Sequence, residues 1–312
     1  MKVLLAIEKT RISSGAIQIL KKLFLPKGSS LFLLHVHSIP QKITGLAKER
    51  ILKLSKHVQE VQKEELEQTN QFLSKVENSL RHQQVRFRSL VKKGFPGEEI
   101  LKLIRTKGVD LVVLGTRSYS KVTGLVLGSV SQWVLQEAPC SVLIARNHPR
   151  KKLNDRTIKL LLATDGSSDA QAAIDFVNAL ELPPLSQITV LHVIKKQVYE
   201  TELALRMTRK DEAEFAKLAE ELFKARGREG AKLLKDTRKA LSSHNVHVDE
   251  QLVYGKAETE ILKSARNMKA DLIVVGSRGL SGLKRMFLGS VSNKIVHHAG
   301  CSVAVIRRQN KK

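Results

Sequence analysis

The sequence predicts an α/β protein made of two tandem doubly wound domains, each with a parallel sheet covered by helices on both faces. Residues 110–118 (DLVVLGTRS) are followed after nine residues by Gly-Ser-Val-Ser, and the same arrangement recurs 161 positions later, beginning with DLIVVGSRG at residues 271–279. Within each repeat, short runs of Val, Ile and Leu alternate with segments of helical spacing. This alternation is typical of parallel strands joined by crossover helices.

The length of 312 residues suits two domains of common size. We expect the first domain at residues 1–148 and the second at 155–312, joined by a polar, proline-containing linker at 147–155. The later elements of the two domains match at an offset of 161, whereas the early ones match at 157, as Glu8 does with Asp165. A four-residue insertion in the second long helical region accounts for the difference.

Apolar runs and helical spacing give the same order of elements in each domain. In the first domain we expect strands at residues 3–7, 30–37, 85–91, 110–114 and 141–145, and helices at 13–24, 41–82, 98–106 and 129–137. In the second domain we expect strands at residues 158–163, 188–194, 247–253, 272–275 and 303–306, and helices at 168–180, 199–243, 257–268 and 290–299.

The chain is strongly basic, with a net charge of +24. Residues 1–152 contain 27 basic and 11 acidic residues, so most of the excess, +16, lies in the first domain. Such a field favours anionic partners: nucleotides, nucleic acid, acidic proteins or anionic membranes. Aromatic residues make up only 4% of the chain, so stacking platforms for single-stranded nucleic acid are scarce.

Bulk features also indicate the compartment and the state of the cysteines. No apolar run approaches the roughly 20 residues that a membrane-spanning helix needs. The first eight residues, MKVLLAIE, are too short and too soon acidic for a signal peptide, so we expect a cytoplasmic protein. Cys140 and Cys301 occupy matched repeat positions, and we expect both to be buried thiols rather than a disulfide.

The second domain contains a glycine pattern at the carboxyl end of a predicted strand. Gly276 and Gly279 are separated by two residues, and nine more residues lead to Gly289 and a helix that begins at Ser290. We expect the glycines to allow positive φ and a close approach of ligand to backbone. The helix start offers N–H groups and a favourable dipole to phosphates. Asp165, at the end of the first strand, is placed for a ribose hydroxyl or an adenine amine.

These motifs resemble the universal stress protein family in its tandem two-domain form, and the resemblance covers nearly the whole chain. It implies a five-stranded parallel sheet in the order 3-2-1-4-5 in each domain, and ATP, with or without Mg²⁺, in the second. The residues it implies around the nucleotide are Ala163, Thr164, Asp165, Val193, Gly276, Ser277, Arg278, Gly279, Gly289, Ser290, Val291 and Ser292. For Arg278, a phosphate contact and an exposed loop cation remain equal alternatives.

The resemblance also implies an intrachain pseudo-dimer in which the last strands, Ser141–Ala145 and Ser302–Ile306, meet edge to edge. A further homodimer is left open. The first domain departs from the family pattern, because Ser118 replaces the second glycine and Glu8 replaces the aspartate. We therefore expect the nucleotide in the second domain and weaker or no binding in the first.

Three functions remain in competition. The leading one is a stress-response regulatory protein that binds an adenine nucleotide and is not an enzyme, or is at most a weak ATPase. Another is weak ATPase or nucleotidyl-type activity, against which the absence of a visible general base and metal carboxylate pair argues. The alternative is a basic interaction protein for nucleic acid, an acidic protein or a membrane, with the glycine elements as structural turns.

His35 and His192, at strand ends, are expected to be packed or hydrogen-bonded rather than metal-bound.

Overall fold

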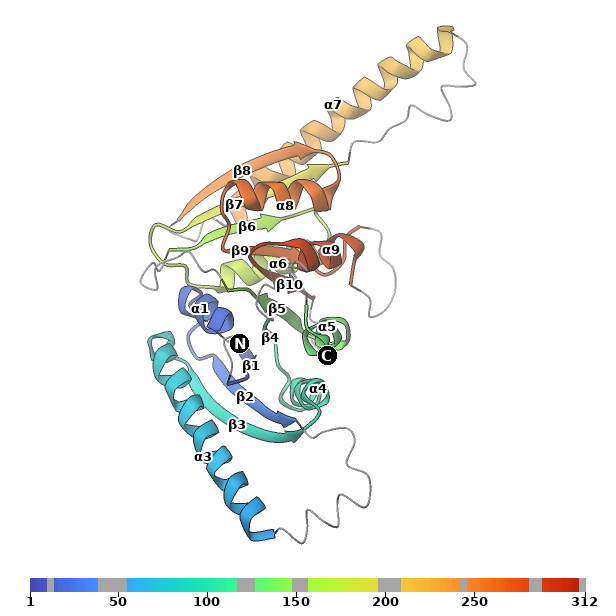
Figure 1. Ribbon diagram of the computed structural model, residues 1–312. Helices are drawn as coiled ribbons and strands as arrows, with labels where there is room; N and C mark the ends of the chain where they lie inside the picture. Colours follow the sequence, from blue (N-terminus) through green and yellow to red (C-terminus); the bar gives the residue numbers. More distant parts are fainter. Residues whose placement is uncertain are drawn as a thin grey trace.

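The computed structural model describes residues 1–9, 14–38, 55–116, 127–147, 157–195, 209–241, 246–280 and 288–308. Ten strands form one continuous sheet in the order β3-β2-β1-β4-β5-β10-β9-β6-β7-β8 (Figure 1). The strands are β1 (Lys2–Ala6), β2 (Ser30–Ser38), β3 (Arg86–Gly94), β4 (Leu111–Gly115), β5 (Ser141–Ala145), β6 (Lys159–Ala163), β7 (Gln187–Ile194), β8 (His247–Tyr254), β9 (Leu272–Gly276) and β10 (Ser302–Ile306).

The predicted fold class and strand order are confirmed. Each domain contributes five neighbouring strands in the order 3-2-1-4-5, counted from its own first strand, and all pairings within a domain are parallel. The sheets of the two domains join into one sheet, because β5 pairs with β10 in antiparallel fashion.

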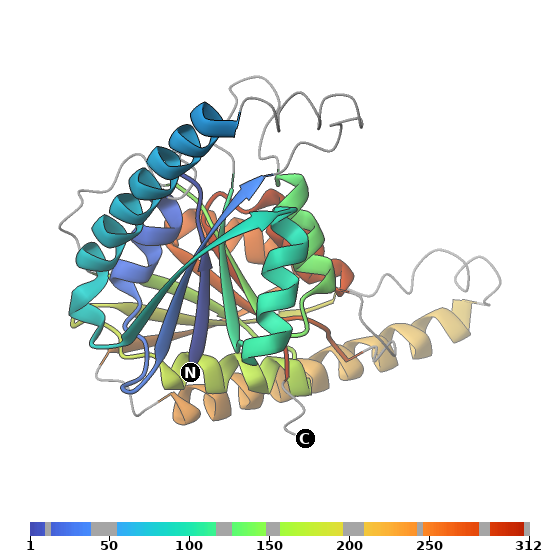
Figure 2. The ribbon, with the colours of Figure 1, turned by 90° about the horizontal axis from the view of Figure 1, so that it is seen from below.

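Two layers of helices enclose the sheet, and each layer draws on both domains. The helices are α1 (Ser14–Lys22), α3 (Ser55–Leu80), α4 (Pro96–Lys107), α5 (Ser129–Glu137), α6 (Ser168–Ala179), α7 (Arg209–Ala240), α8 (Ala257–Asn267) and α9 (Ser290–His298), with a short 3₁₀ turn η2 (Arg81–Gln83). Side chains of α1, α3, α6 and α7 enter one core cluster, and those of α4, α5, α8 and α9 enter the other. Figure 2 shows α3 and α4 on opposite faces of the first-domain strands.

The central strands are apolar at consecutive positions because both of their faces are covered. In β4, Val112 belongs to the core on the α4 side and Val113 to the core on the α1 side, and both are fully buried. The continuous apolar runs in the sequence therefore reflect central strands that are buried on both faces. None of the described helices is both long and apolar enough to cross a bilayer.

The domain junction has approximate two-fold symmetry. In the β5–β10 ladder Leu143 lies opposite Ala304, its own counterpart 161 positions later, so the pseudo-dyad passes near this pair. Phe24 and Glu181, matched at the offset of 157, form a second, isolated antiparallel bridge with N···O distances of 3.3 and 3.0 Å. The expected edge-to-edge contact of the last strands is confirmed.

Backbone groups beyond the two last strands repeat the symmetry. The N–H of Arg146 donates to Ser302 Oγ at 3.1 Å, and the N–H of Arg307 donates to Ser141 Oγ at 3.2 Å. The two donors, Arg146 and Arg307, are counterparts of each other, and so are the two acceptors, Ser141 and Ser302. The junction is thus isologous, like that of a two-fold homodimer, although one chain supplies both sides.

Several element ends differ from expectation. The helix expected from residue 98 begins at Pro96, since a proline suits the first position of a helix, where its missing N–H is not needed. Phe24, expected to end the first helix, instead pairs with Glu181 after α1 ends at Lys22. The linker beyond Asn147, the first parts of both long helical regions, and Arg117 and Ser118 lie outside the described residues.

Candidate functional site

The second domain has a cavity of about 170 Å³ at the carboxyl ends of β6, β7 and β9. Such a position, where the strand order reverses, is where open α/β sheets bind ligands. Of the twelve residues predicted for a nucleotide site, the cavity is lined by eleven: Ala163, Thr164, Asp165, Val193, Gly276, Arg278, Gly279, Gly289, Ser290, Val291 and Ser292. Ser277 does not line the cavity; its side chain is buried behind it.

Asp165 holds the turn that follows β6 against the glycine loop. Its Oδ1 accepts the N–H of Ser167 at 3.0 Å, and its Oδ2 accepts the N–H of Leu280 at 3.2 Å. A Cβ built on Gly279 would lie 2.7 Å from that same Oδ2. The carboxylate therefore occupies the space that any side chain at position 279 would need.

The positive φ expected for the motif glycines is wrong, because none of the three adopts a left-handed conformation. Close approach explains them instead. A Cβ on Gly276 would lie 2.8 Å from the backbone carbon of Asp169, and one on Gly289 would lie 3.1 Å from the carbonyl oxygen of Ser277. The left-handed glycine of the site is Gly166, with φ of 78°, directly after Asp165.

Asp169 organises the loop after β9, and the sequence analysis missed it. Its Oδ2 accepts hydrogen bonds from Ser277 Oγ at 2.5 Å, from the N–H of Arg278 at 3.1 Å and from Arg278 Nε at 3.3 Å. Asp169 is only 3% exposed. The available signal was an acidic residue in the first turn of α6, matched in the first domain by Ile12.

Arg278 is therefore neither free in solvent nor simply a loop cation. Its guanidinium lines the cavity and pairs with Asp169, while 43% of its side chain stays exposed. A guanidinium has five N–H donors, so pairing through Nε leaves donors directed elsewhere. An anion in the cavity would find this charge already held in place.

The first turn of α9 forms the polar wall of the cavity. Gly289 precedes the helix in an extended conformation and donates its N–H to the carbonyl of Ser277 at 2.8 Å. Ser292 Oγ donates to the carbonyl of Gly276 at 2.7 Å, so this hydroxyl closes the loop rather than pointing a proton at a ligand. Ser290 and Val291 bring to the cavity the first N–H groups of a helix, which lack intrahelical acceptors.

The opposite wall of the cavity is apolar. It includes five residues that the sequence analysis did not name: Ala170, Leu191, Ala257, Ile261 and Val275. Their signal was the repeat itself, because the matching first-domain positions of Leu191, Ala257, Ile261 and Val275 line a cavity too. The site thus combines an apolar half with a half built from helix N–H groups, glycines and an arginine.

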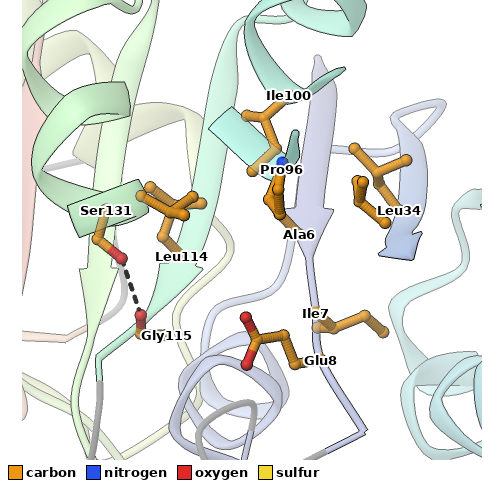
Figure 3. A pocket seen from close by; sticks show the side chains of 11 residues that line it. Ala6, Ile7, Glu8, Leu34, Pro96, Ile100, Leu114, Gly115 and Ser131 are labelled. Atoms are coloured by element: carbon orange, nitrogen blue, oxygen red, sulfur yellow. Dashed lines mark hydrogen bonds between the residues drawn. The ribbon is translucent and has the colours of Figure 1, made fainter. Parts of the chain in front are cut away.

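The first domain has a corresponding cavity of only about 70 Å³ (Figure 3). Glu8 stands at its rim in place of Asp165, Pro96 in place of Ala257 and Leu114 in place of Val275, each larger than its counterpart. Ser131 Oγ donates to the carbonyl of Gly115 at 3.1 Å, as the dashed line in Figure 3 marks, so the loop closure is retained. Among the described residues, the first-domain cavity thus has larger side chains at these three positions and keeps the same hydroxyl-to-carbonyl bond.

The two strand-end histidines are hydrogen-bonded, as expected. His35 Nδ1 lies 2.9 Å from the carbonyl oxygen of Ile7, and His192 Nδ1 lies 2.8 Å from that of Thr164. In each case the ring nitrogen donates, since a carbonyl only accepts. Burial lowers the pKa of His35 below its usual 6.5. Both rings secure the turn below a cavity.

Comparison with known proteins gives a consistent result. The model of the universal stress protein family matches residues 1–146 and again residues 158–307. Universal stress protein YxiE of Bacillus subtilis is 33% identical over 149 residues, which are 48% of this chain and 98% of that protein. Universal stress protein MJ0577 of Methanocaldococcus jannaschii is 28% identical over 158 residues, 49% of this chain and 96% of that protein.

Among solved structures, a universal stress protein from Archaeoglobus fulgidus matches with a TM-score of 0.57 and 19% identity, covering 99% of this chain and 98% of its own. That similarity concerns the fold, and it extends over both domains. The curated relatives each correspond to about half of the chain, as expected for a duplication. The chain belongs to the universal stress protein family and carries two copies of its domain in tandem.

Proposed function

We propose that the second domain binds ATP or a related adenine nucleotide and that the chain acts as a regulatory protein in a stress response. The observation that carries the proposal is the division of the 170 Å³ cavity into two halves. A purine ring suits the apolar half, and a phosphate chain suits the N-terminus of α9, where N–H groups and the helix dipole favour anions. Asp165 lies between them, within the reach of a ribose.

The residues present fit the nucleotide in chemical type. Ala163, Val193 and Val275 offer a surface without charge for a base, while Arg278 and the first turn of α9 offer donors to phosphate oxygens. A magnesium ion accompanying the phosphates would find the carboxylate of Asp165 at the same edge of the sheet. We expect no efficient hydrolysis, because the carboxylates of Asp165 and Asp169 are both engaged in holding the loop.

The test is the nucleotide content of the full-length protein, together with titration by Mg-ATP. We expect one nucleotide per chain. Val193→Trp fills the apolar half of the second-domain cavity and should abolish binding. Val36→Trp is the matched control, because Val36 is the counterpart of Val193 in the first-domain cavity, and it should leave one nucleotide per chain.

Each other result has a definite meaning. Two nucleotides per chain, reduced to one by either variant, would show that the smaller cavity also binds. No nucleotide and no binding of Mg-ATP would overturn the proposal and make the glycine motif a structural element. If Val193→Trp leaves nucleotide binding unchanged, the nucleotide does not bind in the second-domain cavity and the proposed location is wrong.

A further inference from the structure

Two aromatic side chains are exposed near the start of α4 on the first domain. Phe95 directly precedes α4 and is 39% exposed, and Trp133 lies in α5 and is 41% exposed. The indole of Trp133 rests on Gly97, two residues after Phe95, so closely that a Cβ at position 97 would collide with the ring. The ring of Trp133 is therefore packed against α4, while 41% of the residue remains exposed to solvent.

The second domain provides an internal comparison at the matched positions. There Lys256 replaces Phe95, Glu258 replaces Gly97 and Lys294 replaces Trp133. Lys294 Nζ and Glu258 Oε1 form an ion pair at 2.7 Å. The same surface of the same fold thus carries an ion pair in one domain and an indole seated on a glycine in the other. The two positions have changed together, since a glutamate at 97 would meet the ring.

The charge of the surrounding segment has changed as well. Residues 86–107, which form β3 and α4, contain seven Lys and Arg residues against two acids, Glu98 and Glu99. The matched residues 247–268 contain three basic and four acidic residues. The net charge of the segment is thus +5 in the first domain and −1 in the second. In this segment the excess of positive charge is therefore confined to the first domain.

Several of these cations lie on the side of the sheet that α4 and α5 cover. Leu90 packs into the core beneath α4, so Arg88 and Lys92, two positions away on either side, share its face of β3. Both are exposed, as are Lys102 and Arg105 on α4. β3 is the edge strand of the sheet, so among the described strands none lies beyond it on this side. We name Arg88, Lys92, Phe95, Lys102, Arg105 and Trp133 the aromatic–basic face.

We propose that the aromatic–basic face of the first domain binds single-stranded nucleic acid. Exposed rings beside a track of cations are the two components of such sites, because bases stack on rings while phosphates meet Lys and Arg. A duplex hides its base faces, and an acidic protein offers few planar groups to stack. The scarcity of aromatics in the chain makes the exposure of its single tryptophan at this place more telling.

The single tryptophan also provides the measurement. The full-length protein is titrated with a single-stranded oligonucleotide of about 12 nucleotides, long enough for one such site, while Trp133 fluorescence is recorded. Stacking should quench the emission. The affinity should fall steeply between about 50 and 200 mM salt, as phosphate contacts require. A duplex of the same length should neither quench nor compete at equal concentration.

The decisive variant transfers the ion pair of the second domain to the first: Gly97→Glu together with Trp133→Lys. It keeps the fold that the second domain shows to be compatible with this pair, and an unchanged melting temperature verifies this. With a fluorescein-labelled oligonucleotide, we expect its affinity to fall by about tenfold or more. Val193→Trp, which fills the cavity of the second domain, is the matched control and should leave the oligonucleotide affinity unchanged.

The proposal is overturned if the oligonucleotide leaves Trp133 unquenched at low salt, or if the transfer variant binds it as tightly as the parent chain. It is equally overturned if polyglutamate or anionic vesicles quench Trp133 and the oligonucleotide does not, because the face would then belong to another class of partner. Loss of oligonucleotide binding in Val193→Trp would place the site in the other domain. These results are independent of whether the second domain binds ATP.

Discussion

Arg146 and Arg307, which are 161 positions apart, make the same contact with opposite domains. Arg146 Nη2 donates to the carbonyl of Val296 at 2.5 Å, and Arg307 Nη2 donates to the carbonyl of Leu135 at 2.8 Å. The two acceptors are also 161 positions apart, in the last turns of α9 and α5. A cation at the carboxyl end of a helix meets its unpaired carbonyls and its dipole. Each domain therefore caps a helix of the other.

We expect Arg146→Met to lower the free energy of unfolding by about 1–2 kcal/mol, because the carbonyl of Val296 would be left buried without its donor. Arg146 is 5% exposed, and burial lowers the pKa of its guanidinium, so part of the loss is offset by relief of desolvation. Urea unfolding measures the change. Arg308→Met is the control. Arg308 is exposed and follows Arg307 in the sequence, and its replacement should leave the free energy of unfolding unchanged. Equal stability of the two variants would contradict a structural role for Arg146.

Gly276→Ala should destabilise the protein by about 1–3 kcal/mol, the usual cost of forcing a group into a filled interior. The new Cβ would lie 2.8 Å from the backbone carbon of Asp169, which cannot move without shifting the first turn of α6. Gly300→Ala is the matched control, since no atom lies within 4 Å of a Cβ there. Thermal or urea unfolding of the pair tests the prediction; identical stabilities would refute it.

Gly279→Ser places in the second domain the residue that the first domain has at position 118. Its Cβ would meet a side-chain oxygen, Asp165 Oδ2, which can rotate away, so we expect the fold to remain stable. The displaced carboxylate would lose its bond to Leu280 N–H and its place in the cavity. Given the proposed function, the affinity for ATP should fall by about tenfold or more, equivalent to a charged hydrogen bond. Calorimetric titration measures the affinity for ATP. If the variant is as stable as the parent chain and binds ATP with the same affinity, the prediction is wrong.

The burial of His35 makes stability depend on pH. Its pKa in the folded state is lowered from 6.5, mainly by burial, so the unfolded chain takes up a proton at a higher pH than the folded one. The free energy of unfolding should therefore decrease as pH falls from 6.5 towards the lowered value and then level off. His35→Asn keeps a donor for the carbonyl of Ile7 and should flatten this part of the profile.

The profile of His35→Asn should retain some slope, because burial also lowers the pKa of His297. Unfolding in urea at several pH values between about 5 and 7, around the ordinary value for histidine, gives the comparison. A variant whose slope equals that of the parent chain would show that His35 does not contribute.

Cys140 and Cys301 should be unreactive in the native protein. Both are buried, and burial raises the pKa of each thiol to about 12 from 9.0. Since the thiolate is the reactive form, we expect almost no modification by a thiol reagent at pH 8 and modification of both after unfolding in urea. Rapid reaction of one thiol in the folded state would contradict the burial of that residue.

The repeat and the apolar runs were sufficient to predict the class and the duplication, because these depend on local patterns present in the printed sequence. The edge-to-edge junction was predicted only through the resemblance to the family. Contacts between distant segments were not predictable in the same way. Asp169 and Ser277 are 108 positions apart and meet only after α6 packs on β9. The caps made by Arg146 and Arg307 likewise require the two domains to be assembled.

The glycines show a subtler limit. Their positions in the motif were correct signals of a tight site, but the positive φ that was expected is absent, and it is the protein's own atoms that leave no room for a Cβ. A sequence reveals that a position must be small; it does not reveal whether φ or a neighbour requires it. The opposite occurred at Gly166, whose left-handed conformation passed unnoticed because it stands outside the motif.

The pairing of β5 with β10 gives this chain a freedom that a two-fold homodimer lacks. When two identical subunits meet, every substitution appears twice, and both surfaces must tolerate it. Here Trp133 and Gly97 stand in one half, whereas Lys294 and Glu258 stand at the matched positions of the other. Because the halves are joined in one chain, each substitution appears only once, and the two domains can differ at matched positions while they share the same frame.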